Sequence, residues 1–182
     1  MRALTAVERT WRRWRFDNRL AFRPHVAVGS VIDSAPEDLV ARQFEGSECR
    51  RLDLFVRTLA AAEFAGENNG GIELYAKYRS ARPSERKSVA AFARLFERVA
   101  RDGFAPQYPI AVAQDASIVD GAHRLACTMV LGVPTISLRI VQLPRRFYAV
   151  TSVWFGVHGF TADEIARLQH EAERYRRNLA DP

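Results

Sequence analysis

The chain has 182 residues, of which 48% are hydrophobic and 10% aromatic, and its formal net charge at pH 7 is +6. A chain of this length and apolar content can bury a full core, which excludes a wholly disordered protein. No apolar run approaches the ~20 residues of a membrane span, and the first residues lack the apolar stretch of a secretory signal. Its two cysteines, Cys49 and Cys127, fit neither a disulfide framework nor a zinc site. We therefore expect a folded protein in a reducing cytoplasm.

Residues 1–25 form a basic, aromatic arm. Seven arginines stand there against two acids, a net charge of +5, and Trp11, Trp14 and Phe16 are interleaved with them. This composition is typical of a segment that lies on anionic lipid, here at the inner face of a membrane, with nucleic acid as a less favoured partner. A solvated helix whose tryptophans pack on the rest of the protein is the alternative. The remaining residues, 26–182, are expected to form a single domain.

The part of the chain after the arm is expected to be mainly helical. A helix start is predicted at 35–38, where a proline takes an early helical position, and the apolar residues of 52–60 have the spacing of a core-facing helix. The polar Gly/Asn run 66–71 must be a loop, with another short helix after it. Loops of this kind often close over a ligand. Asn68 and Asn69 are therefore candidates for binding a polar acceptor such as a sugar.

A further helix is predicted from about 84 to 102. Apolar residues recur on one of its faces at Val89, Phe92, Phe96 and Val99. Ser84 is the expected N-cap, which places Glu85 in the first turn, where an acid also complements the helix dipole. Arg82 stands just before this helix.

Residues 108–141 alternate between β-rich and helical patterns. Strands are predicted over 108–113, 117–119 and 134–141, and a helix over 122–131 that Gly132 ends. This order predicts an α+β fold with a small mixed sheet that has helices on both sides. After it, the aromatic stretch 147–155 is expected to add an edge strand.

The chain is expected to end in a helix that runs to about residue 178. Thr161 and Glu164 have the spacing of a capping box, which marks the start of this helix.

The segment from Asp120 to Arg124 has the features of an anion site. The dipeptide Asp120-Gly121 is typical of a tight turn, here between a strand and a helix. The first N–H groups of that helix lack intrahelical partners and lie at the positive end of its dipole. Gly121 allows close approach of a ligand to the backbone. The N–H groups of Gly121, Ala122 and His123, the His123 ring and the Arg124 guanidinium are the predicted phosphate ligands.

Asp120 fits a different role, because its carboxylate would repel a phosphate. An aspartate beside a phosphate cradle can accept a proton from an attacking hydroxyl or hold Mg²⁺. The structural alternative is that Asp120 caps the helix and pairs with Arg124.

The segment 82–141 resembles the ParB/sulfiredoxin-like superfamily. The core of that superfamily is a helix, a Pro-Ile-x-Val strand, a second strand with a Gly-x-x-Arg phosphate loop, a helix ending in Leu-Gly, and a further strand. Here the matching residues are Pro109 to Val112, Gly121 to Arg124 and Leu131-Gly132, in the same order. The resemblance covers about a third of the chain.

The Asp-Gly-x-His-Arg form of the loop is most similar to members that act as small-molecule kinases. Those members place an essential glutamate at the start of the first helix, which Glu85 matches best by order. Sulfiredoxins carry a catalytic cysteine where this chain has Ala122, and partition proteins continue into a DNA-binding domain for which the residues after 141 are too few. Similar segments occur among polysaccharide-assembly enzymes.

The leading hypothesis is therefore a nucleotide-dependent phosphotransferase acting on a small hydroxylated acceptor such as a sugar or glycan precursor. ATP or ADP would bind the loop, assisted by Arg82, with Asp120, Glu85 and His123 as catalytic residues and Asp120 as the ligand of Mg²⁺. Phosphoryl transfer depends mainly on positioning and charge neutralisation, so a sparse site suffices. The alternative is a non-catalytic nucleotide-binding switch that docks on a partner, a membrane or DNA. A nuclease is a weaker option, because the sequence lacks clustered carboxylates for two metal ions.

Overall fold

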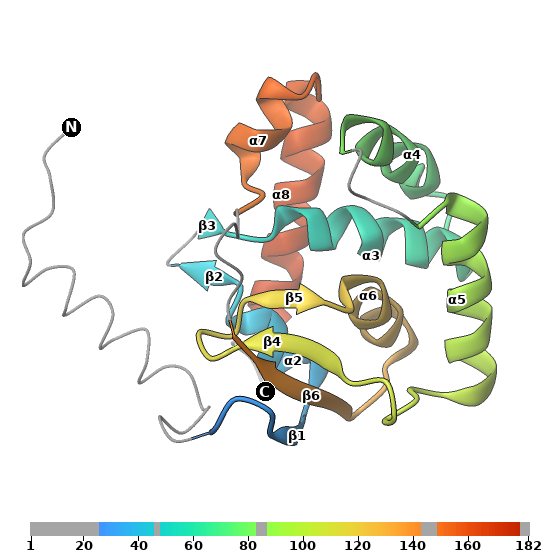
Figure 1. Ribbon diagram of the computed structural model, residues 1–182. Helices are drawn as coiled ribbons and strands as arrows, with labels where there is room; N and C mark the ends of the chain where they lie inside the picture. The colour runs from blue at the N-terminus through green and yellow to red at the C-terminus, as the bar shows by residue number, and fades with distance from the viewer. Residues whose placement is uncertain (1–25, 46–47, 83–86, 143–148, 179–182) are drawn as a thin grey trace, which may run out of the picture.

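The computed structural model describes residues 26–45, 48–82, 87–142 and 149–178. The basic arm and Glu85 lie outside these ranges. The described part of the chain contains a four-stranded sheet, a two-stranded ribbon and seven helices (Figure 1). This arrangement confirms the predicted α+β class with a small mixed sheet.

The main sheet has the strand order β1-β6-β4-β5. Its strands are β1 (Val31–Ser34), β4 (Ile110–Ala113), β5 (Ile118–Asp120) and β6 (Ile136–Val141). Strands β4 and β6 are parallel, whereas β5 pairs with β4, and β1 with β6, in antiparallel orientation. The three strands predicted within 108–141 are therefore present, and β1 adds an edge that the sequence did not predict.

The register of the two central strands aligns their apolar side chains. Ile110 pairs with Leu138 and Val112 with Ile140, and all four are buried in the main hydrophobic cluster. Helix α6 (Ala122–Leu131) follows β5 and contacts β4, and it ends at Gly132 as predicted. Cys127 on α6 is fully buried in the core.

Helix α3 (Leu52–Phe64) lies at the centre of the helical layer. Residues 52–62 are all buried, because α3 contacts α4 (Gly71–Ala81), α5 (Val89–Asp102), α6 and α8 (Ala162–Asn178). Helix α4 approaches α3 so closely that a Cβ at Gly71 would lie 2.6 Å from the backbone nitrogen of Ala60. The glycine that closes the predicted loop is therefore also the contact point between two helices.

Helix α5 begins later than the sequence predicted. Its N-cap is Ser88, whose hydroxyl accepts a hydrogen bond from Ala91 N at 3.1 Å, and not Ser84. A local side-chain cap thus determines the helix start at Val89. Glu85 is therefore not in the first turn of α5, and its position lies outside the described residues.

Of the two predictions for the C-terminal part of the chain, one is wrong and one is confirmed. Residues 152–155, expected to belong to a strand, lie in helix α7 (Ser152–Val157), and Val150 makes an isolated bridge to Arg51. The predicted capping box of α8 is present: Glu164 N donates to Thr161 Oγ1 at 3.2 Å, and Thr161 N donates to Glu164 Oε2 at 2.7 Å. Packing against Phe160 and Tyr78 explains why the aromatic residues of α7 fold as a helix.

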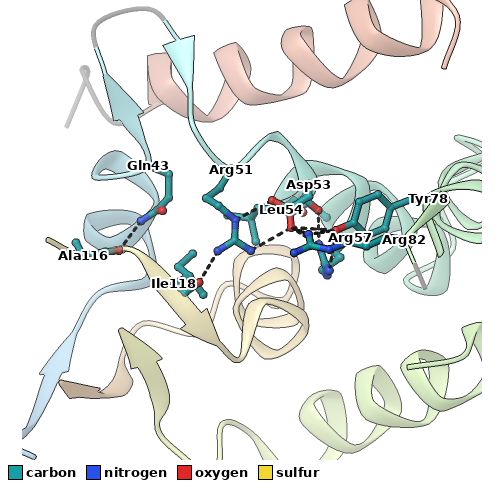
Figure 2. A network of polar contacts seen from close by, with 10 residues as sticks. Gln43, Arg51, Asp53, Leu54, Arg57, Tyr78, Arg82, Ala116 and Ile118 are labelled. Atoms are coloured by element: carbon teal, nitrogen blue, oxygen red, sulfur yellow. Dashed lines mark hydrogen bonds and ion pairs between the residues drawn. The ribbon is translucent and has the colours of Figure 1, made fainter. Parts of the chain in front are cut away.

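Side chains take the place of a further strand beside β5. The ribbon of β2 (Phe44–Glu45) and β3 (Glu48–Cys49) and the short helix α2 (Pro36–Ala41) bring Gln43 and Arg51 to this edge. Gln43 Nε2 donates to Ala116 O at 3.0 Å, and Arg51 Nη1 donates to Ile118 O (Figure 2). Buried carbonyls need such partners, so the edge of β5 is closed to further pairing at these points.

No helix in the described ranges is long and apolar enough to cross a membrane.

Candidate functional site

The predicted turn between strand and helix consists of Gly121 alone. Strand β5 ends at Asp120 and α6 begins at Ala122, with Gly121 in the left-handed region at φ 95°. A Cβ at this position would lie 3.1 Å from the side chain of Ile110 and from Arg124 Nη2. Both the backbone conformation and the space therefore require glycine here.

The N-terminus of α6 presents backbone donors that have no partner within the helix. Leu125 N is the first amide to bond within the helix, donating to Gly121 O at 2.9 Å. Helix geometry leaves the N–H groups of Ala122, His123 and Arg124 without intrahelical partners, and the N-cap glycine has no side chain to cap them. This helix end has the local geometry and dipole that favour an anion.

Asp120 stands at the mouth of this helix end with its side chain 81% exposed. Its Oδ2 lies 3.6 Å from Arg124 Nη2, which is a long contact for an ion pair. The carboxylate is therefore accessible to a ligand from solvent.

Arg124 is bound into the structure more than the sequence indicated. Its Nη1 donates to the carbonyls of Tyr108 and of Pro109, the latter at 3.3 Å, and its side chain is 20% exposed. These bonds attach the start of α6 to the entry of β4. Burial lowers the pKa of Arg124, although the group stays charged at neutral pH. Binding of phosphate by Arg124 stays a prediction. The hydrogen bonds to the two carbonyls give the side chain a structural role as well.

His123 turns away from the open end of the loop into an aromatic environment. Its Nε2 lies 2.7 Å from Tyr75 Oη, and its ring packs edge-on against Tyr75 and Phe92. Burial, followed by the positive charges of Arg57 and Lys87, lowers the pKa of His123 to about 2. The imidazole is therefore neutral at physiological pH. Its predicted catalytic role remains a prediction; with so low a pKa the imidazole is a weak base, so its part would be that of a hydrogen-bonding group.

A buried charge cluster, which the sequence analysis missed, lies next to the loop. We call Arg51, Asp53, Arg57, Tyr78 and Arg82 the Asp53 cluster (Figure 2). Asp53 is fully buried and accepts hydrogen bonds from Arg51 Nε at 2.8 Å, Arg57 Nη1 at 2.9 Å and Tyr78 Oη at 3.2 Å. Arg82 Nη1 lies 3.5 Å from the same carboxylate and 2.5 Å from Tyr78 Oη.

The arginines keep Asp53 ionised despite its burial. Burial alone would raise the pKa of Asp53, but Arg51, Arg57 and Arg82 together lower it well below the usual range of a carboxylic acid. Asp53 therefore cannot serve as a proton acceptor near neutral pH. Its function in the fold is to hold three guanidinium groups in place.

The Asp53 cluster and the loop are joined at two points. Arg51 binds Ile118 O, two residues before Asp120 on β5. Tyr75 and Tyr78 lie three residues apart on α4, Arg82 follows as its C-cap, and Tyr75 contacts His123. The same face of α4 therefore runs from the N-terminus of α6 to Asp53.

The two loop asparagines have different environments. Asn69 Oδ1 accepts from Gly71 N at 2.9 Å, and Asn69 Nδ2 donates to Glu67 at 3.3 Å, so this amide stabilises its own loop. Asn68 is exposed. A role in substrate binding stays a prediction for both residues.

The described residues contain no group of three or more His, Cys, Asp or Glu side chains placed to hold a metal ion. Asp120 alone would suit Mg²⁺ that is shared with nucleotide phosphates, because Mg²⁺ commonly takes one or two carboxylates and retains water. A cleft of about 210 Å³ lies between β3 and α8, lined in part by Phe44, Leu52 and Gln169. None of the predicted site residues lines it.

The local signal for the Asp53 cluster was present in the sequence. Asp53 and Arg57 stand four residues apart within an otherwise apolar helix, and opposite charges at this spacing face each other. Arg51 and Arg82, by contrast, are brought to Asp53 only by the tertiary fold. Comparison with known proteins finds no matching family model, no matching curated protein and no matching solved structure.

Proposed function

We propose that the protein is a nucleotide-dependent phosphotransferase that acts on a small hydroxylated acceptor. The observation that carries the proposal is the position of Asp120: an exposed carboxylate at the mouth of a helix N-terminus whose first N–H groups have no intrahelical partner. The helix end would hold nucleotide phosphates. The carboxylate would accept the proton of the acceptor hydroxyl as that oxygen attacks the terminal phosphorus, and the nucleotide with one phosphate fewer would leave.

The residues of the loop divide these tasks by their chemistry. The N–H groups of Gly121, Ala122 and His123 would bind phosphate oxygens, and Arg124 would fix the loop against β4 while adding positive charge. Mg²⁺, held by Asp120 and the phosphates, would screen the phosphate charge when bound. The resemblance of residues 82–141 to kinase-like members of the ParB/sulfiredoxin-like superfamily supports the same assignment, with Glu85 as an assisting residue.

The site of action proposed with this function is the cytoplasm, where the basic arm would bring the protein to anionic lipid. Free, buried thiols at Cys49 and Cys127 are compatible with a reducing compartment. Burial raises the pKa of each thiol to about 12, so neither is a reactive nucleophile at neutral pH. A sugar or glycan precursor is the acceptor class that fits the resemblance.

The test is to incubate the protein with ATP, ADP or CTP and a panel of sugars and amino acids, and to follow transfer by ³¹P NMR. Asp120→Asn should bind nucleotide as the wild type does but lose at least about 10²-fold in turnover, the lower end of what a positioned base contributes. Asp102→Asn, on the exposed end of α5, is the matched control and should turn over normally. A wild-type protein that binds nucleotide and phosphorylates nothing would instead favour the binding switch.

A further inference from the structure

A chain of hydrogen bonds links the start of α6 to α4 and to the residue before the N-cap of α5. Tyr75, on α4, lies with its hydroxyl oxygen 2.7 Å from Nε2 of His123, the second residue of α6. The same hydroxyl donates to the carbonyl of Lys87 at 2.8 Å, and Lys87 directly precedes the N-cap Ser88. One phenol group therefore joins α4 to the starts of both α5 and α6.

The chemistry of these groups fixes the direction of both hydrogen bonds. A carbonyl oxygen can only accept, so the single hydrogen of the Tyr75 hydroxyl goes to Lys87. In a neutral imidazole one ring nitrogen carries a hydrogen and the other is an acceptor. The bond to His123 therefore requires the ring hydrogen to be on Nε2, which donates to a lone pair of the phenol oxygen. An additional acceptor beside the phenol would compete for the same hydrogen, and Nε2 would still be the donor.

The surroundings of the His123 ring make this hydrogen bond important. The ring packs edge-on against Tyr75 and Phe92, with centroid distances of 5.6 Å and 4.7 Å, and both of these aromatic residues are fully buried. A buried N–H group costs free energy when it loses its acceptor. The phenol oxygen of Tyr75 therefore stabilises the inward orientation of the ring.

The same contact bears on the backbone of the proposed phosphate-binding turn. Leu125 N donates to Gly121 O at 2.9 Å and closes the first turn of α6, which includes the His123 amide. We propose that Tyr75 is a positioning residue, which holds His123 as the Nε2–H tautomer and thereby fixes the first turn of α6 in the geometry that binds nucleotide phosphates. The Nε2 hydrogen is then used inside the protein, and the ring anchors the turn in place of donating to phosphate. The identity of the ligand rests on the proposed function, whereas the anchoring of the turn does not.

The tautomer is tested by ¹⁵N NMR of the imidazole at pH 7 on the full chain. In the wild type, the ring hydrogen of His123 should be on Nε2. Tyr75→Phe keeps the aromatic ring and removes the hydroxyl, so the Nδ1–H form should become populated because Nε2–H loses this acceptor. Tyr175→Phe, which removes a hydroxyl from α8, should leave the His123 spectrum unchanged.

Amide hydrogen exchange tests the anchoring of the turn. In Tyr75→Phe, the Leu125 amide should exchange about tenfold faster than in the wild type, the scale of one lost hydrogen bond. The Ile165 amide, which closes the first turn of α8 by donating to Thr161 O at 3.0 Å, should change much less. His123→Gln, whose amide can donate in place of Nε2–H, should keep most of the protection at Leu125, and His123→Leu should lose it.

Calorimetry with ADP tests the consequence for the proposed function. Tyr75→Phe should bind ADP about tenfold more weakly than the wild type, because the turn that holds the phosphates is no longer fixed by this hydrogen bond. Tyr175→Phe should bind ADP as the wild type does.

The outcomes separate the positioning role from the proposed function. A wild-type ring hydrogen on Nδ1, or a Leu125 exchange rate that is unchanged or rises equally with that of Ile165 in Tyr75→Phe, overturns positioning by Tyr75 even where ADP binds and transfer occurs. Equal ADP affinity of the wild type and Tyr75→Phe overturns it as well. If the wild type neither binds ADP nor transfers phosphate, but the tautomer and the exchange rates are as expected, the phosphotransferase is refuted and the anchoring of the turn by Tyr75 remains.

Discussion

Replacing Asp53 by Asn should destabilise the protein strongly while preserving the shape of the side chain. The substitution removes the only carboxylate that contacts Arg51 and Arg57 within the described residues, and it turns an amide N–H₂ toward guanidinium donors. Breaking a buried ion pair in this way costs roughly 3–5 kcal/mol, because an uncompensated charge stays buried. That is a large part of the ~5–15 kcal/mol by which domains are stable.

The assay is urea denaturation followed by circular dichroism at pH 7. Asp102→Asn serves as the control, since the Arg101–Asp102 pair is exposed and its removal should leave the midpoint unchanged. A loss below about 1 kcal/mol for Asp53→Asn would refute the view that this carboxylate organises the cluster.

Acid gives a second test of the same residue. The pKa of Asp53 is lowered in the folded state, so its contribution to stability is fully present above the unfolded-state pKa of about 3.9 and is lost as the pH falls below that value. Asp53→Asn should lack this part of the acid dependence. An unchanged acid profile in the variant would show that other carboxylates account for it.

Three further substitutions and one deletion test other parts of the structure. Gly71→Ala should lower the free energy of unfolding by about 3 kcal/mol or more through overlap with the backbone of α3, whereas Gly156→Ala, with its nearest neighbour 4.0 Å away, should be nearly neutral in the same denaturation assay. Gln43→Ala should cost about 1–3 kcal/mol by leaving two buried carbonyls without their donor; a neutral result would mean that water replaces the amide. The free energy of unfolding should fall by up to ~1.4 kcal/mol per pH unit as the pH drops below about 6.5, because burial holds the pKa of His123 at about 2 and only the unfolded chain takes up this proton. His123→Gln should remove that share of the slope, and an identical slope in the variant would contradict this reasoning. Deleting residues 1–23 should abolish salt-sensitive binding to anionic liposomes, because each basic residue near such a surface contributes roughly 1 kcal/mol of binding free energy. If the wild type does not bind liposomes at low salt, the arm is not a membrane contact.

The parts of the fold that follow from local pattern could be predicted from sequence. Helix α6 was predicted at its exact bounds, since Gly121 and Gly132 limit it on both sides, and the capping box of Thr161 marked the start of α8. Errors arose where two nearby residues could serve as the same local signal. Ser84 and Ser88 are both suitable N-caps, and only the structure shows that Ser88 is used.

The remaining errors have tertiary causes. The aromatic, β-branched run around Trp154 has strand propensity, yet it forms α7, in which Trp154 packs on Tyr78 and Phe155 packs on Phe160. Strand β1 has only four residues and exists through its pairing with β6, which lies more than a hundred residues away in the chain. Context of this kind overrides propensity and cannot be inferred from a window of sequence.

For the candidate site, the sequence correctly located the turn after Asp120 but could not distinguish which cations face solvent. Arg124 belongs to the clearest motif in the sequence, and yet its guanidinium donates to the carbonyls before β4. Arg82, which stands in a weak motif, reaches solvent. Arg82, at the C-cap of α4, donates to the Tyr78 hydroxyl and lies 3.5 Å from Asp53, so the core sets its position. A change at Asp53 would therefore disturb the position of Arg82 as well as lower the stability of the fold.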